Sequence, residues 1–225
     1  LTHRTADALR EYHAAAAGWP VDRVYLGEVV CSRRRSFRHD DWIDAAARLA
    51  DAGKEVVLSA QALMESEADL RALRRIVANG RWAVEANDMG AVHLLAGHGP
   101  FVAGPHLNIY SAETLALVAS LGATRWVPPV ELSGEALAAI PNVEIAAVCT
   151  RNPERLAEVA GKFGVKKTFT DFRAMLADPQ RRFTARALTR RPLAPAALAL
   201  VNAGAEIRNA TLDDVEAQPE TGTLQ

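Results

Sequence analysis

The chain of 225 residues is long enough to bury a substantial core in one domain or two. Hydrophobic residues make up 49% of it and 26 basic residues nearly balance 27 acidic ones, so neither nucleic acid nor a membrane surface is indicated as a partner. No apolar run approaches the roughly 20 residues of a membrane span, and two cysteines, Cys31 and Cys149, favour a reducing compartment, so we expect a cytoplasmic protein.

Short β-rich segments alternate with longer segments that carry apolar residues at helical spacing. The alternation predicts five strands, near 23–27, 54–59, 82–86, 101–103 and 124–127. Each strand is followed by a predicted helix: 41–52, 67–78 with a stop at Asn79-Gly80, 89–96, one that begins at Ser111 and ends before Gly122, and one capped by Ser133. Regular repetition of strand and helix predicts parallel strands with the helices outside.

Two closures of the sheet fit this alternation, an open doubly wound sheet and a (βα) barrel. No Gly-x-Gly-x-x-Gly motif follows any predicted strand, so the usual support for a dinucleotide-binding open sheet is missing. We therefore predict an α/β protein with a parallel (βα) barrel-like fold that is incomplete, and we expect no NAD(P) site.

The character of the sequence changes after residue 141. Residues 142–180 predict an appended unit of strand, helix, short strand and helix, with Asn152 as the helix cap, Pro153 at its first position and Gly164 near its end. A basic stretch, an alanine-rich segment and an aperiodic polar tail follow. We accordingly divide the chain into 1–141, 142–180 and 181–225.

Polar residues lie at or just after the ends of the five predicted strands. Loops that follow the strands of a parallel barrel share one rim, so we expect a ligand site there, with the candidates Glu28, Glu85, Asp88, Asn108 and Glu131, and with Asn87 beside them. Helix capping is the alternative role for Asn87, Asp88 and Ser133. Arg33 and Arg34, from a run of three arginines, are further candidates because guanidinium groups pair with carboxylates, and a solvated surface is the alternative for that run.

Cys31 has three interpretations: a buried hydrophobe, a nucleophile or a metal-cluster ligand. The arginines that follow it favour the thiolate, but no histidine spacing nominates the base that a nucleophile requires. His93 and His98 are five residues apart, which suits one helical face poorly and makes a zinc site a weak hypothesis. We interpret Cys149 as a buried small hydrophobe.

Five segments within about residues 21–140 resemble the peptidase U32 family, and within it the UbiV-like group: VYLGEVVCSRRR, GKEVVLSAQALMES, VEANDMGAVHLL, PFVAGPHLNIYSAETL and RWVPPVELS. The resemblance implies a (βα) barrel, a 4Fe-4S cluster held by four cysteines, and a heterodimer with a UbiU-like partner in anaerobic hydroxylation of the ubiquinone ring. It also implies a small carboxylated oxygen donor such as prephenate, or a quinone-precursor ligand. Cys31 stands where the family places its first cluster ligand.

The sequence departs from that family where the other cluster ligands are expected. In RRFTAR, Arg182 stands where the resemblance places the second cysteine, and no cysteine follows it. Residues 142–179 resemble instead the second βα unit of the Gfo/Idh/MocA oxidoreductases, without the glycine-rich phosphate turn of the first unit. We expect a UbiV-like accessory protein of anaerobic ubiquinone biosynthesis that has lost cluster ligands. The alternatives are a U32-type peptidase and an inactive chimeric or designed α/β domain.

Overall fold

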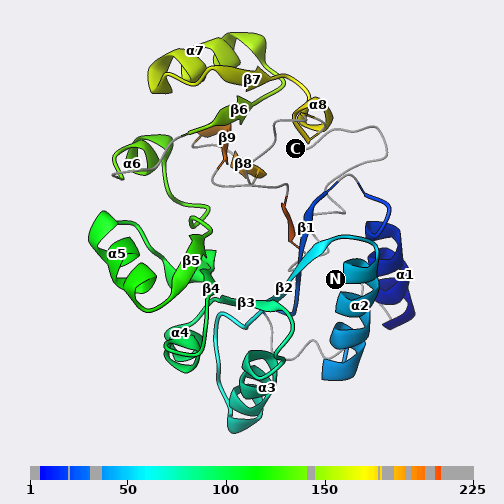
Figure 1. The fold of residues 1–225 in the computed structure, drawn as a ribbon. Helices are drawn as coiled ribbons and strands as arrows, with labels where there is room; N and C mark the ends of the chain where they lie inside the picture. Colours follow the sequence, from blue (N-terminus) through cyan, green and yellow to red (C-terminus); the bar gives the residue numbers. More distant parts are fainter. Residues whose placement is uncertain are drawn as a thin grey trace.

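Strands and helices alternate along the chain (Figure 1). The computed structural model describes residues 6–19, 21–30, 37–140, 145–176, 178, 185–190, 194–200 and 206–208. Its first five strands are β1 (Arg23–Leu26), β2 (Glu55–Ser59), β3 (Ala83–Ala86), β4 (Phe101–Ala103) and β5 (Ala123–Trp126). The helices among them are α1 (Ala6–Ala16), α2 (His39–Asp51), α3 (Glu67–Val77), α4 (Met89–Leu95), the 3-10 helix η1 (Pro105–Leu107), α5 (Ala112–Ser120) and α6 (Gly134–Ala138).

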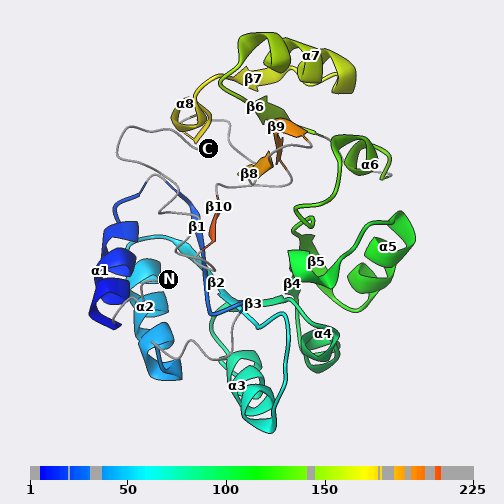
Figure 2. The ribbon, with the colours of Figure 1, turned by 180° about the vertical axis from the view of Figure 1, so that it is seen from behind.

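The five strands form one parallel sheet in chain order, which confirms the predicted alternation. Each strand pairs with the next, for example Tyr25 with Val57 and Glu85 with Val102. The short strand β10 (Glu206–Arg208) pairs in parallel with β1 at the other edge, so the order is β10-β1-β2-β3-β4-β5. The sheet curves, with α2 to α5 following its outer side (Figure 2). The fold is therefore an incomplete (βα) barrel.

The main core lies between the sheet and these helices. Outward-facing residues of β1 and β2, including Leu26 and Leu58, pack against Leu49 of α2 and its buried neighbours. A second cluster joins β3, β4 and β5 to α3, α4, α5 and α6, with Phe101 fully buried in it. Alternation along each strand leaves a second, inward face. Of the helices described, none combines the length and the apolar character needed to cross a membrane.

A smaller unit follows the barrel strands. It consists of β6 (Ala147–Cys149), α7 (Pro153–Phe163), β7 (Lys167–Phe169) and α8 (Phe172–Leu176), and its two strands pair with each other in parallel. As predicted, Asn152 caps α7, Pro153 begins it, and Gly164 ends it with φ of 65°. An antiparallel hairpin of β8 (Ala185–Arg190) and β9 (Ala194–Leu200) comes next in the chain.

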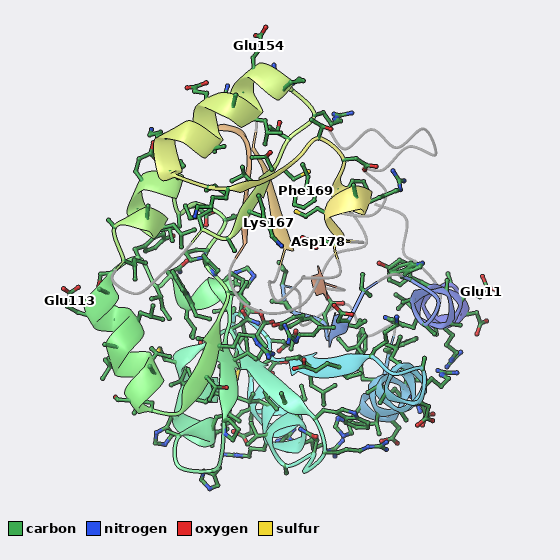
Figure 3. All side chains as sticks on the ribbon, turned by 45° about the horizontal axis from the view of Figure 1, so that its top comes forward. Glu11, Glu113, Glu154, Lys167, Phe169 and Asp178 are labelled. Carbon is green, nitrogen blue, oxygen red and sulfur yellow. The ribbon has the colours of Figure 1, made fainter. Side chains whose placement is uncertain are left out.

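Side chains tie this smaller unit together and to the barrel portion. Lys167 donates a hydrogen bond to Asp178 at 2.8 Å, and both lie near Phe169 (Figure 3). Lys162 of α7 donates to the carboxylate of Glu135 on α6, and this hydrogen bond lowers the pKa of Glu135 to about 2. A Cβ at Gly134 would lie 2.9 Å from the ring of Phe163, so α6 and α7 meet closely.

Candidate functional site

The inward face of the sheet is filled at its middle by apolar side chains. Tyr25, Val57, Val102 and Val127 form a buried cluster, one residue from each of β1, β2 and β4 and one from just after β5. Polar residues lie above and below this layer along the strands, because side chains two residues apart share a face. Within the described strands the interior is therefore packed in layers, as in a barrel.

An ion-pair network closes the amino-terminal end of this interior. Arg23 Nη2 donates to Glu55 Oε2 at 2.6 Å, and Arg125 Nη1 donates to Glu55 Oε1 at 3.0 Å. The Arg23 side chain is only 4% exposed, whereas Glu55 is 46% exposed. Burial pushes the pKa of Glu55 upward, but the two arginines outweigh it and hold that pKa below its ordinary value. This network lies at the end of the barrel that serves stability rather than chemistry.

A buried polar pair lies at the opposite, carboxyl-terminal end. Glu85 is fully buried, and Asn87 is 1% exposed. The Asn87 amide nitrogen donates to Glu85 Oε2 at 2.9 Å and to the carbonyl oxygen of Ala60 at 3.1 Å. The amide thereby fixes the orientation of the carboxylate and joins β3 to the end of β2. Buried Ser59 stands opposite Glu85 in the strand register.

Two glycines permit the close packing around this pair. A Cβ at Gly104 would lie 2.1 Å from Asn87 Oδ1 and 2.8 Å from the Ala86 carbonyl oxygen. A Cβ at Gly27 would lie 2.3 Å from the Ser59 carbonyl oxygen. Real Cβ atoms do not approach other atoms so closely, so both positions require glycine for steric reasons. The sequence shows these glycines at strand ends but does not reveal what approaches them.

The rim beyond the buried pair carries exposed apolar side chains. Exposed large hydrophobic residues follow all five strands in turn, and we call them the apolar rim: Val30, Leu63, Met89, Tyr110 and Val130. Their exposed fractions range from 39% to 61%. Single exposed hydrophobic residues are ordinary, but a set that recurs at one edge of a sheet is typical of an interaction surface.

The predicted rim candidates occupy several different environments. Glu28 is half-buried after β1, Glu85 belongs to the buried pair, and Glu131 is exposed between β5 and α6. Asn108 adopts a left-handed conformation after η1, with φ of 55°, and Tyr110 Oη donates to its side chain at 3.5 Å. That these residues serve one ligand stays a prediction. Cys31, Arg33 and Arg34 lie outside the described residues.

Helix capping was the alternative role for Asn87, Asp88 and Ser133, and two of these three residues do cap a helix. Asp88 caps α4, with Oδ1 accepting from the Gly90 backbone N–H at 2.6 Å, and Ser133 caps α6. Asn87 caps no helix, because its amide is used inside the barrel. Asp88 is therefore engaged in local structure, whereas Asn87 is a buried residue of the interior.

A cavity of about 260 Å³ lies between α2 and α3. Its floor is formed by Leu26 and Leu58, and its walls include Trp42 and Ile43 of α2 and Leu73 of α3. The cavity reaches the rim, where Glu28, Ser59 and Gln61 are among its lining residues. The helical pattern of the sequence identified Trp42 and Ile43 as an apolar stripe but did not indicate a cavity beside it.

The described residues do not supply the ligand set of an iron-sulfur cluster. Within the described part of the chain, no three His, Cys, Asp or Glu side chains lie together as metal ligands. Cys149 is a free, buried thiol that packs against Met175, and burial, with the charge of Asp171, raises its pKa. A raised pKa disfavours the thiolate that binds iron.

Comparison with known proteins identifies the family of this chain. Residues 8–150 match the family model of Peptidase family U32, a match that runs from α1 to the end of β6. No solved structure matches the chain significantly.

Proposed function

Because the chain belongs to peptidase family U32, we propose that it is a UbiV-like accessory subunit in oxygen-independent ubiquinone biosynthesis. In this proposal its rim docks a UbiU-like partner in the cytoplasm, and the complex hydroxylates the ubiquinone ring. The resemblance of the motifs around Cys31, Asn87 and Asn108 to the UbiV-like group supports the specific assignment, beyond family membership.

The apolar rim is the observation that carries the proposal. An accessory subunit needs a surface that a partner covers, and Val30, Leu63, Met89, Tyr110 and Val130 offer apolar area along one edge. A partner seated there would also cover the end of the barrel that holds Glu85 and Asn87.

A U32-type peptidase is the second candidate, and it rests on the family match. A peptidase needs an activated nucleophile or a metal-bound water. Of the two cysteines, Cys149 is buried and has a raised pKa, and Cys31 lies outside the described residues. Among the described residues, the apolar rim supports the accessory role, whereas Cys149 gives no support to proteolysis.

A matched pair of variants tests the role of the rim. Leu63 on the rim is 61% exposed, and Leu117 on α5, away from the rim, is 58% exposed. The chain is produced anaerobically with a UbiU-like protein in bacteria that lack their own UbiV-like protein. Co-purification of the two proteins is measured first, and ubiquinone content second. We expect the wild-type chain and Leu117→Glu to co-purify with the partner and restore ubiquinone, and Leu63→Glu to do neither.

Three outcomes would contradict the proposal. A wild-type chain that neither binds the partner nor restores ubiquinone removes the accessory role. Leu63→Glu that binds as well as Leu117→Glu removes the rim as the interface. Release of peptides from a casein substrate by the purified wild-type chain, lost in Cys31→Ser, would favour the peptidase instead.

A further inference from the structure

We propose that a shallow hollow on the outer surface, between α2 and the turn that joins α3 to β3, binds a small phosphate monoester. We call this site the outer hollow, and it is open to solvent. It shares His39 and Ile43 with the cavity of about 260 Å³. No residue of the apolar rim lines it, nor does Glu85 or Asn87, so the inference goes beyond the proposed function and does not depend on it.

Two arginines that lack a carboxylate partner line the outer hollow. Arg75 lies in the last turn of α3 and Arg81 in the turn that follows, and both side chains are exposed. Among the described residues, no carboxylate forms an ion pair with either guanidinium, whereas the neighbouring Arg74 pairs with Glu67 at 3.2 Å. The N–H donors of Arg75 and Arg81 are therefore open to an added anion.

The turn that carries Arg81 is held in one conformation by the Asn79 side chain. Its oxygen accepts from the backbone N–H groups of Arg81 and Trp82, at 2.9 and 2.7 Å. Its nitrogen donates to the carbonyl oxygens of Ile76 and Trp82, at 2.7 and 3.1 Å. The Arg81 guanidinium lies over the Trp82 ring, 4.8 Å from the centroid. Because a stacked guanidinium keeps its N–H donors along its edge, Arg81 is positioned for an anion before one binds.

The donors of the outer hollow come from three places, which favours a tetrahedral anion over a planar one. Arg75 comes from α3 and Arg81 from the turn, while His39 in the first turn of α2 offers a ring N–H in either protonation state. A carboxylate holds its two oxygens in one plane and suits a single guanidinium fork. A phosphate monoester directs three acceptor oxygens to different sides, so it can accept from all three residues.

The remaining lining residues account for the charge and for the ester. Two arginines face one carboxylate, Asp40, so the described lining has an excess of one positive charge when His39 is neutral. Asp40 is exposed, and water screens its repulsion of an anion. Ile43 and Trp82 are only half-buried, which leaves apolar surface for the carbon part of an ester. Free phosphate has no group that would cover this surface.

NMR titration of the full chain at pH 8 and low salt tests the proposal with three probes. Phenyl phosphate and phenylmalonate share a ring and are both dianions at this pH, and inorganic phosphate lacks the ring. We expect phenyl phosphate to bind with a Kd of about 1 mM, at least about threefold more tightly than either other probe. The Trp82 indole signal should shift on binding, and that of Trp126, which is only 7% exposed, should not.

Four variants with exposed side chains locate the binding. Arg75→Gln and Arg81→Gln should each weaken phenyl phosphate binding about fivefold or more. Arg48→Gln, on α2 outside the hollow, is the matched control and should leave it within about twofold. Asp40→Asn should strengthen binding at least about twofold, because it removes a like charge.

Four results would overturn the proposal. The first is a Trp82 signal that phenyl phosphate does not shift. The second is inorganic phosphate or phenylmalonate that binds as tightly as phenyl phosphate. The third is an Arg48→Gln variant that weakens binding as much as Arg81→Gln. The fourth is an Asp40→Asn variant whose affinity is not increased, since the phosphate would then lie outside the hollow.

Discussion

Glu55→Gln is expected to lower the free energy of unfolding by about 2–3 kcal/mol at pH 7. Arg23 is 4% exposed and donates to Glu55 at 2.6 Å, and Arg125 donates to the same carboxylate at 3.0 Å. Loss of the carboxylate charge leaves the buried Arg23 cation with less compensation, and breaking a buried ion pair costs about 3–5 kcal/mol. Since Glu55 is 46% exposed, water screens part of this interaction, so we place the loss at or below the lower end of that range.

The effect of Glu55 should depend on pH with a definite sign. The folded-state pKa of Glu55 lies below its ordinary value of 4.5, because the two arginines outweigh burial. A depressed carboxylate pKa adds stability that is fully present above the unfolded-state pKa and is lost as the pH falls through the folded-state pKa. Wild type and Glu55→Gln should therefore differ most at neutral pH and converge as the pH falls below 4.5.

Urea denaturation followed by circular dichroism, at pH 7 and at several lower pH values, measures both effects. Glu11→Gln, on the exposed face of α1, is the matched control and should change stability by no more than about 0.5 kcal/mol. A Glu55→Gln variant as stable as this control at pH 7 would refute the reasoning. The reasoning would also be refuted if the difference in unfolding free energy between wild type and Glu55→Gln stayed constant from pH 7 down to the acid transition.

Three further outcomes are expected. Gly104→Ala should destabilise the protein by about 1–3 kcal/mol, because the new Cβ would lie 2.1 Å from the amide oxygen of Asn87. Gly161→Ala should instead stabilise it by about 0.5–1 kcal/mol, because Gly161 lies in α7 and a Cβ there would meet nothing within 4 Å. Denaturation curves in which Gly104→Ala is the more stable variant would contradict both expectations. Lys162→Met should raise the pKa of Glu135 from about 2 toward 4.5, as measured by NMR titration. An unchanged pKa would show that the hydrogen bond from Lys162 does not cause the shift. Anaerobic reconstitution with iron and sulfide should leave the isolated chain without a stable four-iron cluster, because it holds two cysteines where four thiolates are needed; about four irons per chain, lost on Cys31→Ser, would contradict this.

Local signals in the sequence predicted the elements of the barrel well. The caps at Ser111, Ser133 and Asn152 and the stop before Gly122 lie where the structure has them, because capping depends on residues three or four apart. The five parallel strands were predicted for a similar reason, because a strand can be recognised from its own apolar run and the polar turns that bound it, without knowing which distant strand it pairs with.

Contacts between distant residues could not be predicted in the same way. Arg125 meets Glu55 across 70 positions of sequence, and the meeting requires β5 and β2 to curve toward one another. Asn87 had the sequence context of a helix cap, but it lies two residues after Glu85 and shares its inward face, so its amide bonds Ala60 and Glu85. The cavity beside Trp42 depends on how far apart two helices lie, which periodicity does not encode.

In the proposed function, one end of the barrel interior serves stability and the other serves partner binding. At the amino-terminal end, Glu55 holds two arginines together, so substitution there acts on folding. At the carboxyl-terminal end, Leu63 and the rest of the apolar rim stand in solvent, so substitution there changes little in the isolated chain. Loss of partner binding in Leu63→Glu with unaltered stability therefore identifies an interface. Loss of partner binding in Glu55→Gln would instead follow from unfolding, and the denaturation curves distinguish the two cases.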